Sequence, residues 1–209
     1  MPKIKDVSYK QFLQTGLIDI INKDRFKDML ANVEHKYKKQ ARALFIILYY
    51  GGRRPVEVLD LMAENIKKER QRLRIMFPTA KKGRYTTLYM PMRNEHINEF
   101  YKYASKLFPK QYIFWAFRGG SSNRVKYLSG GTTKFKNYVR TTARLYYWFR
   151  KWCKLPPYYF RHNRFSTMAQ EGATIPQIAH AKGAADMRSV MPYVHMSKAE
   201  AAKLIKYYK

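Results

Sequence analysis

A mostly α-helical fold with one small antiparallel β-hairpin or sheet is the fold class that this sequence predicts. Apolar residues recur at helical spacing over most of the chain from residue 22 onward. Residues 72–90 instead contain two short runs rich in β-forming residues on either side of a basic turn. Hydrophobic residues make up 46% of the 209 residues, which is enough to bury a sizeable core.

The helices are expected at the following places. Asn22 caps a first helix, and a second helix, which carries Leu44 and Leu48, ends at Gly51-Gly52. Pro55 suits the first turn of a third helix, because its missing N–H needs no partner there. Further helices are expected at about 94–107, at about 135–152, after Pro157 with breaks near Gly172 and Gly183, and at 198–209.

The expected β-hairpin has a basic tip. Residues 72–77 alternate in polarity, residues 85–90 are rich in β formers, and Pro91 ends the second strand. Residues 79–84 form the turn between the two strands. A Gly/Ser-rich basic loop is expected at residues 117–132.

The charge of the chain indicates a polyanionic partner. Lys and Arg number 42 against 14 Asp and Glu, a formal net charge of +28. Each phosphate that a cation neutralises releases counterions and adds affinity, so nucleic acid is the leading candidate. An anionic membrane is the second, but the chain has no long apolar run and no signal-peptide pattern. Because 18 Tyr, 12 Phe and 3 Trp fit a folded body, a packing protein of the ribosomal or chromatin kind is less favoured.

Metal and disulfide chemistry find little support in the sequence. Cys153 is the single cysteine, which excludes an intramolecular disulfide and a multi-cysteine metal site. The five histidines do not follow a metal-ligand spacing. No metal and no cofactor are therefore expected.

Four short motifs stand in a fixed order along the chain. They are Gly52-Arg-Arg-Pro-Val-Glu57, Lys81-Lys-Gly-Arg84, Tyr158-Tyr-Phe-Arg161-His162, and Gly183 with Tyr193-Val-His195 ten residues on. An Arg at a helix start favours a bound anion, and a Glu three residues later can hold it. Taken alone, each motif is equally a surface salt bridge, a solvated charge run or a core helix. Their joint order and spacing carry the interpretation.

In that order and spacing, the motifs resemble those of the tyrosine recombinase (phage integrase) family. Gly52, Arg54 and Glu57 match its Gly-x-Arg-x-x-Glu motif, and Arg161 with His162 match its Arg-His pair. Lys82 fits the family's hairpin lysine, with Lys81 as a close rival. Gly183, Tyr193 and His195 match the glycine of Leu-Gly-His and the Tyr-x-His motif.

Two positions depart from the family pattern. Tyr158 stands where the family has the first His of His-x-x-Arg-His, and Ala184 stands where it has the His of Leu-Gly-His. Integrases of archaeal viruses and plasmids show such departures, so this type is expected. His180, one helical turn before Ala184, either supplies an imidazole nearby or occupies a plain surface position.

The resemblance implies a reaction. Tyr193 would be the nucleophile that forms a 3′-phosphotyrosyl bond, Arg54 and Arg161 would grip the phosphate oxygens, and Lys82 would protonate the 5′ oxygen. Tyr158 would donate a hydrogen bond to the phosphate. Supporting roles fall to Glu57, His162, His180 and His195, and contacts to the DNA backbone to Lys81, Arg84, Arg118 and Arg124.

The resemblance also implies the organisation of the chain and its partners. Residues 1–24 are expected to be a leader or linker remnant, 25–197 the catalytic domain, and 198–209 a helix that docks on a neighbouring protomer or on its own domain. The expected partners are a double-stranded DNA attachment site and further copies of the chain, as a tetramer on DNA. The expected location is the nucleoid in a prokaryotic cytoplasm, with no membrane.

Three alternatives stay open at this point. A type IB topoisomerase would share the nucleophile and the two arginines. A degenerate, DNA-gripping module without catalysis would explain Tyr158 and Ala184. An RNA-binding protein is the weakest of the three, because no motif of the RRM or KH type is present.

Overall fold

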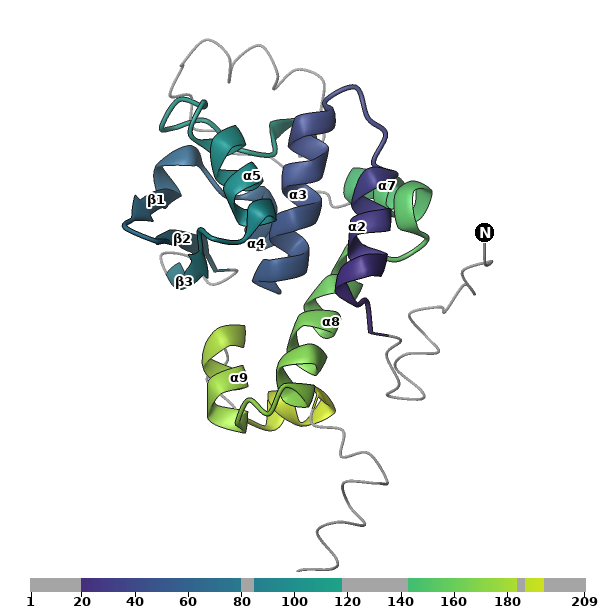
Figure 1. Ribbon diagram of the computed structural model, residues 1–209, viewed down its shortest axis with the longest axis vertical. Coiled ribbons are helices and arrows are strands. Elements are labelled where there is room, and N and C mark those ends of the chain that lie inside the picture. The colour runs from purple at the N-terminus through teal and green to yellow at the C-terminus, as the bar shows by residue number, and fades with distance from the viewer. Residues whose placement is uncertain (1–19, 80–84, 118–142, 184–186, 194–209) are drawn as a thin grey trace, which may run out of the picture.

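The computed structural model describes residues 20–79, 85–117, 143–183 and 187–193. Within these ranges the predicted fold class is confirmed, because helices surround one small antiparallel sheet (Figure 1). The helices are α2 (Lys23–Ala31), α3 (Lys38–Gly51), α4 (Pro55–Leu59), α5 (Glu95–Ala104), α7 (Ala143–Cys153), α8 (Pro157–Gln170) and α9 (Ile175–Lys182). The strands are β1 (Ile66–Glu69), β2 (Arg72–Pro78) and β3 (Tyr85–Pro91), and the short 3₁₀ helices are η1 (Ala63–Asn65), η2 (Trp115–Phe117) and η3 (Met187–Tyr193).

Helix α3 lies at the centre of the main core. It contacts α2, α4, α5 and α8, and its consecutive residues Leu44 to Leu48 are all fully buried. The Phe45 ring lies 5.0 Å from the rings of Phe149 on α7 and Phe160 on α8. Burying side chains of this size contributes roughly 1.5–3 kcal/mol each. The apolar, helix-favouring run that predicted this helix therefore also fixes its place inside the molecule.

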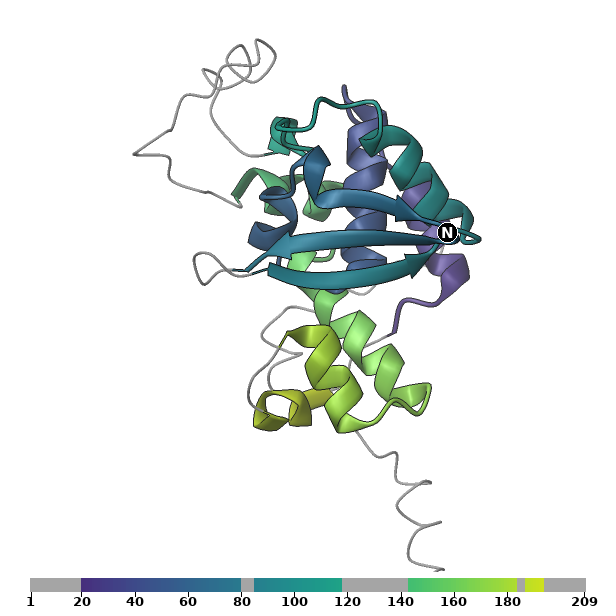
Figure 2. The same cartoon turned by 90° about the vertical axis from the view of Figure 1, so that its left-hand side faces the viewer.

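The sheet has three strands in the order β1-β2-β3, all antiparallel. Figure 2 shows the strands in front of α3 and α5. Along β2, Leu73, Ile75 and Phe77 are buried and alternate with more exposed residues, as the sequence pattern predicts. Strand β1 was not predicted, because its Ile-Lys-Lys-Glu sequence has a single apolar residue. The tip of the β2–β3 hairpin, residues 80–84, lies outside the described residues.

The expected helix boundaries near the candidate motifs are confirmed. Gly52 ends α3 in the left-handed conformation with φ 58°, and Gly183 ends α9 in the same way with φ 68°. Pro55 is the first residue of α4, as its fixed φ favours. Asn22 caps α2, because its side chain accepts a hydrogen bond from the backbone N–H of Arg25.

Helix α8 leads from the main core to a smaller unit formed with α9 and η3 (Figure 1). This unit has its own apolar cluster, made by Phe165, Ile178, Ala179, Val190 and Tyr193. At the other end of α8, Tyr159 and Phe160 are buried in the main core. Helix α8 is therefore anchored in one core while it carries residues of the other.

Part of the long helix expected before Pro156 is present as α7. Tyr146 and Tyr147 on this helix face solvent, and the Tyr147 side chain is 62% exposed. Apart from Phe117, the expected basic loop at 117–132 lies outside the described residues, as does the expected helix at 198–209. In the described part of the chain, no helix combines the length and the apolar character that crossing a bilayer requires.

We expect Gly52→Ala to destabilise the protein more than Gly172→Ala. Both glycines have positive φ, so each alanine costs about 1 kcal/mol in backbone strain. A Cβ at Gly52 would also lie 2.9 Å from Arg164 Cγ and 3.0 Å from Arg164 Cβ, whereas nothing lies within 4 Å of one at Gly172. Overpacking of this kind adds roughly 1–3 kcal/mol. Urea denaturation of both variants measures the difference, and equal losses would contradict the close approach of α8 to Gly52.

Candidate active site

The guanidinium of Arg161 joins three segments of the chain. Arg161 lies on α8 and is only 1% exposed. Its Nη1 donates to the carbonyl oxygen of Gly52 at 2.8 Å, and its Nη2 donates to that of Lys182 at 3.2 Å. A guanidinium has five N–H groups, so these two bonds leave others for a ligand. Burial, and then the neighbouring Arg54, lower the pKa of Arg161 from its ordinary value.

Arg54 is held at the start of α4 by Glu57. The Glu57 carboxylate accepts hydrogen bonds from the Arg54 backbone N–H at 3.1 Å and from Arg54 Nη1 at 2.9 Å. The Glu57 side chain is buried, whereas that of Arg54 is 44% exposed. Burial lowers the pKa of Arg54, but Glu57 and then Tyr158 raise it, and the overall shift is upward. The arrangement therefore leaves a fixed, charged guanidinium open to solvent.

Tyr158 and His162 lie on the face of α8 that borders Arg54. Tyr158 is hydrogen-bonded to Arg54, and its ring lies 5.0 Å from the imidazole of His162, one helical turn on. His162 is buried, and burial, with Arg161 and Lys182, lowers its pKa to about 4. The imidazole of His162 is therefore neutral at physiological pH.

Tyr193 lies at the end of η3, inside this group of side chains. It is 4% exposed, and its ring lies 5.4 Å from both the imidazole of His162 and the ring of Phe165. It is near enough to Arg161 for its charge to affect the pKa of that guanidinium. The structure therefore brings together four of the residues that the sequence singled out: Arg54, Tyr158, Arg161 and Tyr193.

Two residues of the cluster were missed by the sequence reasoning. Arg53 is buried, lies over the ring of Phe77 at 5.3 Å, and has a pKa lowered to about 10, mainly by burial. Its Nε and Nη2 have no hydrogen-bond partner among the described residues. Lys182 ends α9, with its Nζ 5.0 Å from the centre of the Tyr193 ring. The sequence did hold a signal for Lys182, because a Lys stands there in place of the Leu of the family motif. For Arg53, the one signal was its position next to Arg54 in the chain.

Other predicted site residues lie elsewhere or outside the described residues. His180 is exposed on α9, in agreement with the surface alternative. Lys81, Lys82, Arg84, Arg118, Arg124, Ala184 and His195 lie outside the described residues. The base of the hairpin does reach the site, because a Cβ built on Gly183 would lie 3.1 Å from Thr86 Oγ1 on β3 and 3.2 Å from Arg53 Nη1.

The site has an excess of positive charge. Its cations are Arg53, Arg54, Arg161 and Lys182, and the carboxylate of Glu57, which bonds to Arg54, partly offsets their charge. Burial, followed by Arg161 and Arg54, lowers the pKa of Lys182 to about 8. Clustered guanidiniums favour a phosphate or another oxyanion. The charge of this arrangement therefore favours a phosphate as a ligand.

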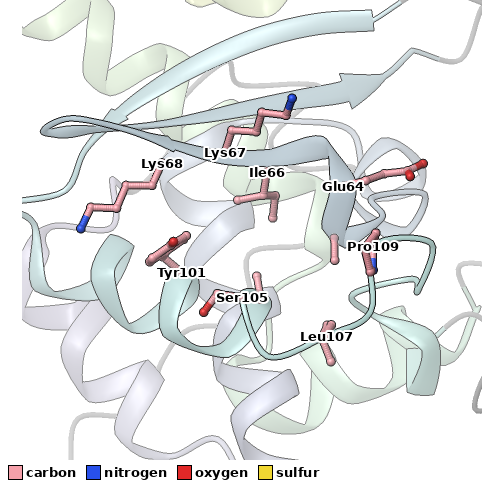
Figure 3. A pocket seen from close by; sticks show the side chains of 10 residues that line it. Glu64, Ile66, Lys67, Lys68, Tyr101, Ser105, Leu107 and Pro109 are labelled. Carbon is pink, nitrogen blue, oxygen red and sulfur yellow. The ribbon is translucent and has the colours of Figure 1, made fainter.

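A separate pocket of about 320 Å³ lies between β1 and α5 (Figure 3). Lys67 and Lys68 lie on its strand side, and Tyr101 and Ser105 lie on its helix side. The residues that line it come from none of α4, α8, α9 and η3, so it is not part of the arginine cluster. Within the described ranges, no three His, Cys, Asp or Glu side chains are grouped so as to hold a metal ion.

We expect the free energy of unfolding to fall as the pH is lowered from about 6.5 to about 4, in part because of His162. The pKa of its imidazole is about 4 in the folded protein and about 6.5 when unfolded. Below 6.5 the unfolded chain therefore binds a proton that the folded protein does not. The stability that His162 contributes is fully present above 6.5 and is lost toward pH 4, at most on the order of 3 kcal/mol.

His162→Gln should make this pH dependence shallower, as measured by urea denaturation at each pH. His180→Gln, which changes an exposed histidine on α9, is the matched control and should leave it unchanged. Burial also lowers the pKa values of His35 and His96. These two histidines contribute equally to the pH dependence of the wild type, His162→Gln and His180→Gln. Identical slopes for the wild type and His162→Gln would contradict a buried neutral imidazole.

Comparison with known proteins places this chain in a family. The sequence profile of the phage integrase family matches residues 19–200, and no curated protein matches the chain. The fold is similar to that of the XerH site-specific recombinase in its post-cleavage complex with a palindromic difH substrate. The TM-score is 0.61 at 16% identity, over 90% of this chain and 53% of that one.

Two further structures have the same fold. The XerA recombinase gives a TM-score of 0.59 at 14% identity, over 92% of this chain and 64% of its own. The Tn1549 transposon integrase in complex with circular intermediate DNA gives 0.51 at 14% identity, over 89% and 64%. The chain thus spans 53% to 64% of the length of these proteins, and its fold is that of tyrosine recombinase catalytic domains. Because the profile covers most of the sequence, the chain belongs to the phage integrase family.

Proposed function

We propose that this chain is a site-specific DNA recombinase that cuts and rejoins strands through a 3′-phosphotyrosyl bond to Tyr193. The observation that carries the proposal is the position of Tyr193, which is buried against the cluster that contains Arg54 and Arg161. A phenol nucleophile beside two guanidiniums is suited to attack on a phosphodiester, whose non-bridging oxygens the guanidiniums neutralise.

The proposed step is a direct exchange at phosphorus. The Tyr193 oxygen, having lost its proton, attacks the phosphorus, and the bond from phosphorus to the 5′ oxygen breaks. Arg54 and Arg161 hold the non-bridging oxygens through the transition state. Lys82 on the hairpin gives a proton to the departing 5′ oxygen. The phosphotyrosyl bond keeps the energy of the phosphodiester, so a second 5′ hydroxyl restores the DNA without ATP.

Double-stranded DNA is the proposed substrate, and the net charge of +28 supports it. The XerH and Tn1549 proteins of similar fold were solved as complexes with DNA. Lys81, Arg84, Arg118 and Arg124 are proposed to contact backbone phosphates, and four copies are proposed to assemble on the attachment site. The proposal extends to integration of viral or plasmid DNA of the archaeal type into a host chromosome, at the nucleoid in the cytoplasm.

A degenerate DNA-gripping module is the second candidate function. Tyr158 and Ala184, in place of two family histidines, favour it. A type IB topoisomerase would form the same covalent bond but would not recombine two sites. A recombinase cleaves DNA, whereas the DNA-gripping module does not. A recombinase also exchanges strands between two duplexes, whereas a type IB topoisomerase does not.

The first test looks for the covalent intermediate with a pool of nicked duplexes of randomised sequence. After cleavage, the short fragment that carries the new 5′ hydroxyl diffuses away, so the covalent intermediate accumulates. We expect an SDS-resistant protein–DNA adduct from the wild type and none from Tyr193→Phe. The matched control is Tyr147→Phe, which changes a tyrosine that is 62% exposed on α7 and should leave the adduct unchanged. Sequencing of the captured DNA would identify the preferred site.

Two results would contradict the proposal. An adduct that survives Tyr193→Phe would assign the nucleophile to another residue. A wild-type protein that retards the pool on a gel but yields no adduct would be the DNA-gripping module.

The second test separates Lys82 from Lys81 as the general acid. On an ordinary duplex, we expect Lys82→Ala to slow adduct formation by about 10²-fold and Lys81→Ala to slow it much less. On a duplex with sulfur in place of the 5′ bridging oxygen, the leaving thiolate needs no proton, so Lys82→Ala should approach the wild-type rate. If the sulfur substitution restored the rate of Lys81→Ala and not that of Lys82→Ala, Lys81 would be the general acid.

A further inference from the structure

Lys182 is the residue of the cluster that lies directly over the proposed nucleophile. Its Nζ is 5.0 Å from the centre of the Tyr193 ring. The same Nζ donates a hydrogen bond to the carbonyl oxygen of Ser189 in η3, the element that ends at Tyr193. Its own carbonyl oxygen accepts a bond from Arg161 Nη2. Lys182 therefore touches the nucleophile, the helix that carries it and the buried arginine.

The surroundings of this ammonium are cationic. The charged and titratable groups that face it from α8, the start of α4 and η3 are Arg161, His162, Arg54 and Tyr193. Arg53 lies beyond Gly183, the next residue in the chain. Burial, then Arg161 and Arg54, lower the pKa of Lys182 to about 8. Among these neighbours, an ionised Tyr193 is the group that would give the ammonium an opposite charge.

A tyrosine attacks phosphorus as the phenolate, which at neutral pH is a minor species unless its surroundings favour it. An opposite charge within about 4–6 Å favours the ionised form by roughly 1–3 pH units. The ammonium of Lys182 lies in that range of the ring that would carry the charge. The guanidinium of Arg161, by contrast, is committed to two backbone carbonyls and, in the proposed reaction, to the phosphate.

We propose that Lys182 is a positioning residue for the cleavage reaction, whose ammonium stabilises the Tyr193 phenolate and holds η3 against α9. This inference rests on the proposed role of Tyr193 as the nucleophile. The proton of the phenol passes to solvent, Lys182 stays protonated before and after the attack, and no proton is transferred to it. Its position in the chain is that of the leucine in the Leu-Gly-His motif, two residues before Ala184.

A plain structural role is the alternative. A Lys in the last turn of a helix is favoured by the helix dipole, and the bond to Ser189 would then only join two segments. The two roles differ in what they require. A structural role needs a donor, whereas stabilisation of the phenolate needs a charge that persists at the pH of the reaction.

The first experiment needs no DNA, so it does not depend on the proposed function. Tyrosine labelled with ¹³C at the ζ carbon reports ionisation by NMR, and loss of one signal in Tyr193→Phe assigns Tyr193 among the 18 tyrosines. In Lys182→Met we expect the ionisation midpoint of Tyr193 to rise by about one pH unit or more. Lys182→Arg, which keeps the charge, should stay near the wild type. Lys102→Met, at an exposed lysine on α5, is the matched control.

The second experiment follows the rate of adduct formation against pH with the nicked pool. Wild type should show a bell-shaped profile, which rises as Tyr193 ionises and falls at higher pH as Lys182 loses its charge. Lys182→Met should lower the maximum about tenfold. Lys182→Arg should retain activity and extend it to higher pH, because a guanidinium stays charged. A structural lysine would not move the falling limb in this way.

The outcomes separate the two proposals. No adduct from the wild type would overturn the proposed function, while the NMR midpoints would still decide the role of Lys182. A wild-type adduct with an unchanged Tyr193 midpoint and an unchanged pH profile in Lys182→Met would overturn the inference alone. Where Lys182→Met does not fold, as judged by circular dichroism, an Arg variant with the wild-type pH profile would overturn it in the same way.

Discussion

The buried guanidinium of Arg161 is the constraint on which the candidate site depends. It donates to the carbonyl oxygens of Gly52 and Lys182, which end α3 and α9. Carbonyls at helix C-termini lack intrahelical partners and carry partial negative charge, so one cation satisfies two helix ends. Arg54 lies two residues after Gly52, and η3 follows Lys182 closely. The same two bonds therefore set the position of Tyr193 relative to Arg54 and Arg161.

This arrangement costs stability in the free protein. Burial lowers the pKa of Arg53 and Lys182, which means that the fold disfavours their charged forms. Glu57 compensates part of the positive charge, but its carboxylate is committed to Arg54. A bound phosphate would supply the missing negative charge, and a ligand that binds only the folded state stabilises it. The proposed affinity for a phosphodiester and the loss of stability would then be two consequences of one charge distribution.

The sequence predicted the parts of the structure that local patterns determine. Helical periodicity and the glycines at positions 52 and 183 located α3, α9 and their ends, and alternation located β2. Strand β1 has one apolar residue in four, so its pairing depends on β2 rather than on its own sequence. The order of the motifs also predicted that Arg54, Arg161 and Tyr193 lie together.

Arg53 and Lys182, by contrast, could not be placed in the site from the order of the motifs. Charged residues are usually solvated, so a sequence gives no reason to place Arg53 in the interior. Its burial follows from tertiary contacts with Phe77, on a strand more than 20 residues further along the chain, and with the end of α9. Lys182 reaches Tyr193 because η3 folds back on α9. In the proposed reaction, proton handling therefore depends less on an imidazole base than on the cations of the cluster. Burial, and then Arg161 and Lys182, keep His162 neutral, and the charge of Lys182 would favour an ionised Tyr193.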